Sequence, residues 1–202
     1  MVTDVIKIDN QAKGVRQAIG ITEMAAEFGG LSHKEGIRLR LLTEELIGMT
    51  RGIAGQIMSD FWIEQNDKSY TLHLKFEIRM TREIREQLLG VSSSGKNSAQ
   101  LGFMGKLLEG IATMMLPYDD AYSDAISGNL GFMTMGDIDT HQQSVNAYRW
   151  SLQNYKESLG EGDETDAAWD ELEKSIVASI ADDVKVSVKG SNVEIVICKN
   201  FK

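Results

Sequence analysis

Two segments of the sequence carry side chains that could take part in chemistry. The first holds Glu44 and Glu45, within a run whose apolar residues recur at helical spacing. On a helix, a carboxylate and a polar group three or four residues away share one face, where they can hold a water or a metal ion together. Adjacent carboxylates on a helix are also typical of an ordinary solvated face, so both interpretations stay open at this point.

The second segment is Gly90-Val-Ser-Ser-Ser-Gly-Lys-Asn97, which nearly matches a phosphate-binding loop. In such a loop, backbone amides and a lysine bind phosphates and a Ser or Thr hydroxyl holds magnesium. Asn97 stands in place of the hydroxyl residue, although Ser98 follows. The loop should also come after a buried parallel strand, whereas residues 82–87 predict an exposed helix. The sequence therefore favours a flexible loop before a capped helix.

Composition excludes several function classes. The chain has 202 residues and a net charge of −9, which repels nucleic-acid backbones. Its single cysteine, Cys198, rules out a disulfide within the chain, and its three histidines are far apart without zinc-ligand spacing. No apolar run reaches the length of a membrane span, and the charged, alternating N-terminal residues do not resemble a signal peptide. We expect no metal site, no membrane segment and a cytoplasmic location.

The elements that must position these residues follow from periodicity and capping signals. A helix is predicted from Asn10 to the Gly29-Gly30 pair, and a second helix from the Ser32–Glu35 capping box to about Gly52 or Gly55. Residues 101–116, 141–159 and 167–181 predict further helices. The first helix is expected to bury an apolar stripe of Val15, Ile19, Met24 and Phe28. Strands are expected at residues 5–9, 60–65, 70–80, 184–188 and 193–198.

The order of these elements predicts an α+β fold. Strands that come in hairpins, with amphipathic helices between them, indicate a two-layer sandwich. We expect a mainly antiparallel sheet of about five strands, with helices covering one face, in a single domain over residues 1–202.

The segment Leu41-Leu-Thr-Glu-Glu-Leu-Ile-Gly-Met49 resembles the asparagine-bearing helix of the histidine-kinase-type (GHKL) ATPases, and most closely that of the anti-sigma-factor kinases. Leu101-Gly-Phe-Met-Gly-Lys-Leu-Leu108 is similar to the Gly-x-Gly-Leu turn that follows the mobile lid of that family, a turn that places amides and a helix N-terminus against phosphates. The resemblance covers residues 5–116 and 184–201. Residues 118–183 have no counterpart and are expected to be a mostly helical insertion.

The resemblance implies a nucleotide site whose positions are altered in this chain. Glu45 takes the place of the catalytic carboxylate, and Gly95, Lys96, Ser98 and Gly102 take places in the lid and the phosphate-binding turn. Met49 stands where the family has its magnesium-binding Asn, and a thioether is a poor ligand for this hard cation. The family's Asp-x-Gly-x-Gly motif, whose Asp pairs with adenine, is also missing after the central strand; residues 81–85 stand there instead.

Three functions follow from these observations. The resemblance implies a regulatory protein-binding module that has lost ATP hydrolysis and needs no cofactor. It also implies a protein partner and a homodimeric state, as the family's inheritance. The first alternative is an active, ATP- and magnesium-binding serine kinase or ATPase. The second is an unrelated sensor or small-molecule-binding domain, with a pocket lined by the aromatic residues Tyr148, Trp150, Tyr155 and Trp169.

Overall fold

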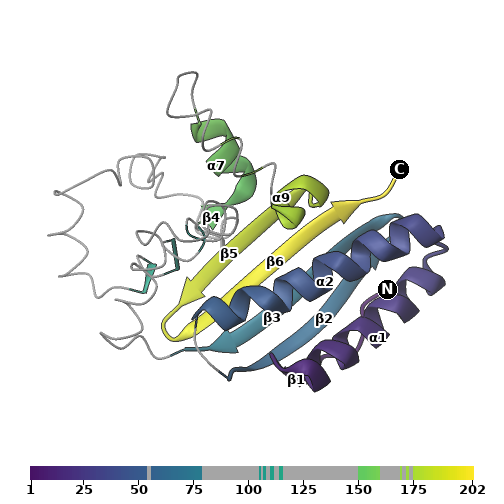
Figure 1. Ribbon diagram of the computed structural model, residues 1–202, viewed down its shortest axis with the longest axis horizontal. Helices are drawn as coiled ribbons and strands as arrows, with labels where there is room; N and C mark the ends of the chain where they lie inside the picture. Colours follow the sequence, from purple (N-terminus) through teal and green to yellow (C-terminus); the bar gives the residue numbers. More distant parts are fainter. Residues whose placement is uncertain are drawn as a thin grey trace, which may run out of the picture.

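The computed structural model describes residues 1–53, 56–78, 150–159 and 175–202, together with Gly105, Leu107, Gly110, Ile111, Met114, Met115, Trp169 and Leu172. Two long helices and a six-stranded sheet make up this part of the chain (Figure 1). The α+β class and the antiparallel sheet are thus confirmed, because every strand pairing in it is antiparallel. The expected number of strands was wrong: the sheet has six strands rather than about five.

The sheet has the strand order β1-β2-β3-β6-β5-β4. Its strands are β1 (Ile6–Asp9), β2 (Met58–Asn66), β3 (Ser69–Glu77), β4 (Trp150–Ser151), β5 (Asp183–Lys189) and β6 (Asn192–Asn200). Both predicted hairpins are present. A two-residue turn joins β2 to β3 through Asp67, which has a φ of 51°, and another joins β5 to β6 through Gly190, which has a φ of 62°.

One face of the sheet carries the hydrophobic core. Phe61, Leu74, Ile195 and Val186 lie side by side on four neighbouring strands and are all fully buried. The residues between them along each strand point to the other face, where charged and polar side chains prevail. This alternation is what fixes the register, since a slip by one residue would expose the whole apolar set.

Helices α1 (Ala12–Phe28) and α2 (His33–Ile53) lie in front of the sheet in Figure 1, with α2 running across β3 and β6. The capping box that opens α2 is confirmed: the Ser32 amide donates to Glu35 Oε2 at 2.7 Å, and the Glu35 amide donates to Ser32 Oγ at 3.4 Å. These two bonds satisfy amides that a helix start would otherwise leave unpaired.

The buried face of α1 differs from the predicted apolar stripe. Small residues line it, and they let the helix approach the sheet and α2 closely: Gly14, Ala18, Thr22, Ala25 and Ala26. Met24 and Phe28 were expected to be buried but are 63% and 74% exposed. The helix also begins later than predicted, at Ala12, because Asn10 is itself buried between β1 and β2 and Asp9 Oδ1 accepts from the amides of Gln11 and Gly14.

Described residues of the segment 118–183, which was expected to be a mostly helical insertion, contribute to the same sheet. Trp150, predicted to be helical, lies in the edge strand β4 and pairs with Val186. Helix α7 (Leu152–Ser158) begins only after Ser151, whose hydroxyl accepts from the Asn154 amide at 3.1 Å. Helix α9 (Ile176–Ile180) is five residues long and packs against α2. No helix in the described ranges is long and apolar enough to cross a membrane.

Candidate functional site

Glu45 lies on α2, on the side of the helix that is only half-buried. It shares this side with Glu44 and Gly48, while the neighbouring positions Leu46, Ile47 and Met49 are buried. Burial raises the pKa of the Glu45 carboxyl, and the nearby Glu44 carboxylate raises this pKa further. Glu44 is held differently, by an ion pair with Arg40 Nε at 2.9 Å, and Arg40 also contacts Glu23 at 3.3 Å.

The space beside Glu45 is not closed by side chains of its own helix. A Cβ atom added at Gly48 would meet no atom of the described residues within 4 Å. A half-buried carboxylate with a raised pKa next to open space has the environment of a general base, and such perturbed groups cluster at functional sites. Chemistry would require a second polar group close by to hold the reacting molecule.

Met49, one turn after Glu45, does not supply that group. It is 2% exposed and belongs to the hydrophobic core, so its thioether packs against apolar side chains. The magnesium implied by the resemblance does not fit these residues, because a buried sulfur in an apolar environment cannot replace an amide or carboxylate oxygen as its ligand. Within the described residues, no group of three or more His, Cys, Asp or Glu side chains could hold a metal ion.

The other predicted nucleotide-site positions, Gly95, Lys96, Ser98 and Gly102, lie outside the described residues. Of the aromatic residues predicted to line a pocket, Trp150 and Tyr155 are instead buried in the core, with ring centroids 6.3 Å apart. Trp169 is 39% exposed, and Tyr148 lies outside the described residues. The structure thus brings Glu45 and Met49 close together but gives them different environments.

A second polar cluster, on the sheet face away from the core, was not predicted. The rings of Trp62 and His73 stack in parallel with centroids 4.5 Å apart, and His73 is only 7% exposed. Its Nδ1 lies 3.0 Å from Glu194 Oε1, and its Nε2 lies 3.7 Å from Glu64 Oε1. The cluster joins side chains from β2, β3 and β6. The hairpin register could have revealed the Trp62–His73 pair, because a two-residue turn fixes which residues lie opposite.

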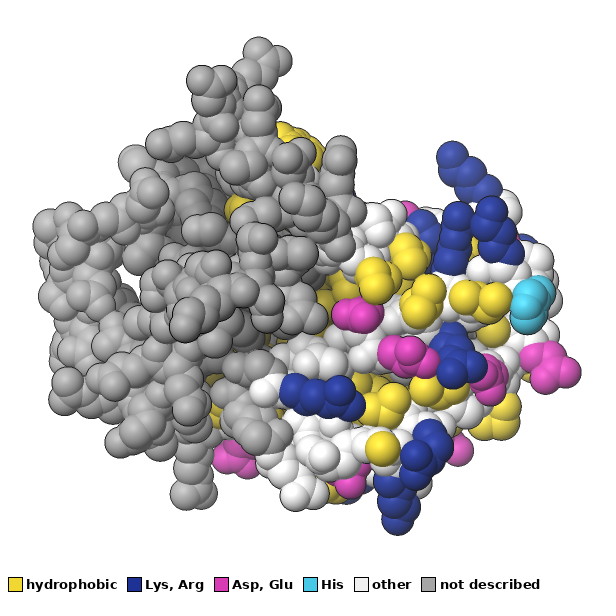
Figure 2. Space-filling view, viewed as in Figure 1, with side chains coloured by type: hydrophobic (Ala, Val, Ile, Leu, Met, Phe, Trp, Pro, Cys, Tyr) yellow, Lys and Arg dark blue, Asp and Glu magenta, His cyan; other side chains and the backbone are white. Residues whose placement is uncertain are grey.

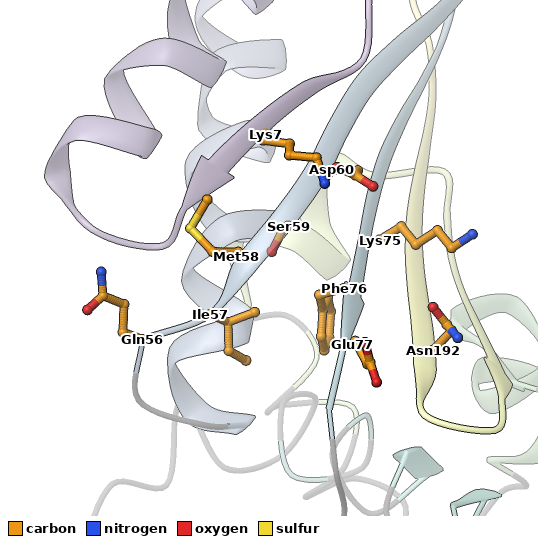
Figure 3. Close-up of a pocket in the computed structure, with 10 residues that line it drawn as sticks. All are labelled: Lys7, Gln56, Ile57, Met58, Ser59, Asp60, Lys75, Phe76, Glu77 and Asn192. Atoms are coloured by element: carbon orange, nitrogen blue, oxygen red, sulfur yellow. Dashed lines mark ion pairs between the residues drawn. The ribbon is translucent and has the colours of Figure 1, made fainter.

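Next to this cluster, the polar face carries a row of alternating charges. Lys7, Asp60, Lys75 and Glu194 occupy paired positions on β1, β2, β3 and β6. Lys7 Nζ lies 3.6 Å from Asp60 Oδ1. Figure 3 shows the Lys7 side chain reaching toward Asp60. Opposite charges directly across neighbouring strands stabilise a sheet modestly.

The row borders a cavity of about 420 Å³ at one end of the sheet. Figure 3 shows the lining side chains, which come from β1, β2, β3 and β6 and from the segment before β2: Lys7, Gln56, Ile57, Met58, Ser59, Asp60, Lys75, Phe76, Glu77 and Asn192. The lining is mostly polar and lacks Glu45 and Met49. This cavity is therefore distinct from the position that the resemblance implies for a nucleotide.

No family model matches the chain, and neither a curated protein nor a solved structure matches it.

Proposed function

We propose that this chain is a regulatory protein-binding module, built on a fold like that of the histidine-kinase-type ATPases and without their ATP hydrolysis. In this proposal α1 and α2 form a helical layer on one face of the sheet, as in a two-layer sandwich. The order β1, α1, α2, β2, β3 and a closing β5–β6 hairpin supports the resemblance, and so does the contact of α2 with β3 and β6.

The burial of Met49 is the observation that supports the proposed loss of ATP hydrolysis. ATP hydrolysis in this fold needs a magnesium ligand one turn after the catalytic carboxylate, and here that position is 2% exposed and apolar. Glu45 alone retains a suitable environment. Without a magnesium ion beside it, the Glu45 carboxylate cannot orient the phosphates of ATP for attack by a water molecule.

The outer surface of the helical layer supports protein binding. Figure 2 shows hydrophobic side chains among charged ones over this surface. Met24 and Phe28 on α1, and Ile37 on α2, are all large apolar residues with close to half or more of their surface exposed. Exposed apolar groups set among charges are typical of surfaces that a partner covers. The proposal includes a cytoplasmic setting, where Cys198, the single thiol, would stay reduced.

Isothermal titration calorimetry with ATP and magnesium tests the loss of nucleotide chemistry. We expect no binding up to millimolar ATP and no release of phosphate in a parallel turnover assay. Micromolar binding or measurable turnover would overturn the proposal in favour of an active kinase or ATPase. In that case Glu45→Ala and Lys96→Ala should abolish the activity, and the same titration of Lys189→Ala, whose exposed side chain lies at the end of β5 outside the cavity, serves as the control.

One observation favours a second candidate, the binding of a small molecule. The cavity of about 420 Å³ has a volume typical of ligand sites. The side chain of Lys75 lines it without an ion pair to any described residue, so an anionic group of a ligand could contact it. A thermal-shift screen of small carboxylates and phosphates, repeated on Lys75→Gln, tests this candidate: a shift that Lys75→Gln does not reduce would exclude binding at this cavity.

A further inference from the structure

The first strand, β1, forms one edge of the sheet. Among the described strands it pairs only with β2, while the opposite edge is formed by β4, which is two residues long. In an antiparallel pair, every second residue directs its backbone N–H and C=O groups away from its partner strand. The hydrogen bond from the Asn10 amide to the Ile57 carbonyl and the register of the pair direct the backbone groups of Lys7 and Asp9 outward. Those of Asp9 lie against Gly14 of α1, so the edge that an added strand can use lies at Lys7 and toward the N-terminus.

The row of charges on the polar face indicates what such a strand should carry. From β6 to β1 the row reads Glu194, Lys75, Asp60 and Lys7, so its sign alternates at every step and ends on a lysine. The Lys7 side chain is 81% exposed. An acidic residue on a strand beside β1 would lie directly opposite Lys7 and would continue the alternation, which favours pairing across strands.

The neighbouring surface of α1 indicates what the other face of that strand should carry. The side of α1 that meets α2 is marked by the hydrogen bond between the hydroxyls of Thr22 and Thr43, 2.9 Å apart. Ile21, Met24 and Phe28 recur at three and four residues on the opposite side of the helix. Because α1 also packs on β1, and lies beside it on the side away from β2 in Figure 3, this apolar stripe extends past the edge of the sheet.

The stripe ends at a second cavity, of about 510 Å³, between the end of α1 and the β2–β3 turn. Phe28, Met1 and Gln65 are among its lining residues. Gln65 is 8% exposed, and its side-chain oxygen has no hydrogen-bond partner among the described residues. A buried acceptor without a donor is costly, and a donor group from a bound chain entering this cavity would satisfy it.

We infer that the free edge of β1 binds an extended segment of a partner protein, which adds to the sheet as a further strand. The segment carries an acidic residue opposite Lys7 and apolar residues on its inner face against Met24 and Phe28. Backbone hydrogen bonds supply affinity in this mode of recognition, and the side-chain positions supply specificity. The inference rests on the proposed function, since it gives the protein-binding module a binding surface and a class of partner.

Binding of three synthetic peptides, measured by fluorescence anisotropy, tests the inference. The first alternates valine and threonine with a central glutamate on the threonine face. The second has lysine in place of the glutamate, and the third keeps the glutamate but has N-methyl groups on the amides that would face β1. We expect the glutamate peptide to bind at least about 10-fold more tightly than either of the others, since one charge pair or a few backbone bonds change affinity by this order.

Variants of the protein locate the binding surface. Lys7→Glu should reverse the preference, so that the lysine peptide binds more tightly, and Phe28→Ser should weaken binding of the glutamate peptide about 10-fold. Lys34→Glu on α2 is the matched control for charge, and Ile176→Ser on α9, where the side chain is 44% exposed, is the matched control for apolar surface. Neither should change the affinity. Circular dichroism of each variant confirms that it is folded.

Two results would overturn the strand-addition model. One is the absence of binding by the glutamate peptide, and the other is equal binding of the N-methylated peptide. Neither result bears on the loss of ATP hydrolysis, which calorimetry tests separately. Conversely, ATP turnover by the protein would overturn the proposed function without changing the peptide affinities.

Discussion

Met49 lies one helical turn after Glu45 on α2, yet the two side chains are in opposite environments. Met49 is 2% exposed within the core, whereas the Glu45 carboxyl is half-buried beside open space at Gly48. Residues four apart on a helix lie on one face, but the last turns of α2 are buried on most sides, so a small angular offset separates core from surface. This offset decides which of the two positions can meet a ligand.

An asparagine at position 49, the residue that the resemblance to the histidine-kinase-type ATPases implies there, should therefore destabilise the protein without creating a magnesium site. Met49→Asn removes a buried thioether and buries an amide without partners, for an expected loss of about 2–4 kcal/mol in the free energy of unfolding. Urea denaturation measures the loss, and calorimetry with ATP and magnesium should still show no binding.

The matched control for that variant is Met24→Asn on α1, where the side chain is 63% exposed. Its stability should change by less than about 0.5 kcal/mol, as for most surface substitutions. Equal losses for Met24→Asn and Met49→Asn would contradict the burial assigned to Met49.

The raised pKa of Glu45 predicts a pH-dependent effect of Glu45→Gln. Burial, and then Glu44, raise the folded-state pKa of Glu45 above its unfolded value, so the folded chain binds this proton more tightly. Stability is therefore highest with respect to this group below the unfolded pKa, and it falls as the pH rises through the folded pKa. At pH 7 Glu45→Gln should gain up to about 0.5 kcal/mol, a small value because solvent screens a half-exposed group, and the gain should vanish by about pH 3.

Glu44→Gln is the control, and its effect should have the opposite sign. It removes the exposed ion pair with Arg40 at 2.9 Å, so a small loss of stability is expected. Thermal unfolding of both variants across the pH range measures the two effects. A Glu45→Gln protein that is less stable than the parent at neutral pH would show that the carboxylate has a stabilising partner.

Local signals in the sequence predicted the strands and helix starts that depend on neighbouring residues. Alternation found both hairpins, and the Ser32–Glu35 spacing found the start of α2. Strand β4 was missed because two residues have no period, and its pairing with Val186 depends on a partner far along the chain. The buried face of α1 was misread because Gly14, Ala18 and Ala25 give a weak hydrophobic signal although they pack closely.

For the candidate site, the sequence could predict only those properties that depend on the chemistry of a single residue. Methionine is a poor magnesium ligand wherever it lies, so its presence at position 49 already argued against catalysis. The charge row could not be predicted, because the pairing of Lys75 with Glu194 requires knowing that β3 and β6 are neighbours and in which register they pair. Alternation assigns both residues to the outer face but says nothing about which side chains meet there.

The close packing of α1 can be tested with two glycine substitutions in the same helix. Gly20→Ala adds a Cβ that meets no atom within 4 Å in the part of the chain that the structure describes, so it should stabilise the protein by about 1 kcal/mol through helix propensity. Gly14→Ala would place its Cβ against the backbone oxygen of Asp9, so it should destabilise by about 1–3 kcal/mol. Chemical denaturation of the two variants gives both values, and stabilisation by Gly14→Ala would refute the close approach of α1 to the end of β1.

Asn10, which lies between β1 and α1, allows a test of how much a buried side-chain hydrogen bond contributes to stability. Asn10 is 1% exposed, and its Oδ1 accepts from the amide of Ile57 at 3.3 Å and from Gln11 Nε2 at 3.1 Å. Asn10→Ala leaves the buried Ile57 amide without this acceptor, so we expect a loss of about 1–3 kcal/mol.

Two measurements separate this loss from a general weakening of the fold. Asn66→Ala, at an exposed position next to the β2–β3 turn, should cost less than about 0.5 kcal/mol. Hydrogen exchange of the Ile57 amide should accelerate in Asn10→Ala by more than the change in global stability explains, because the bond to Asn10 Oδ1 is lost locally. If exchange at Ile57 instead followed global unfolding in both variants, the amide would have another acceptor, and the junction between β1 and β2 would not depend on the Asn10 side chain.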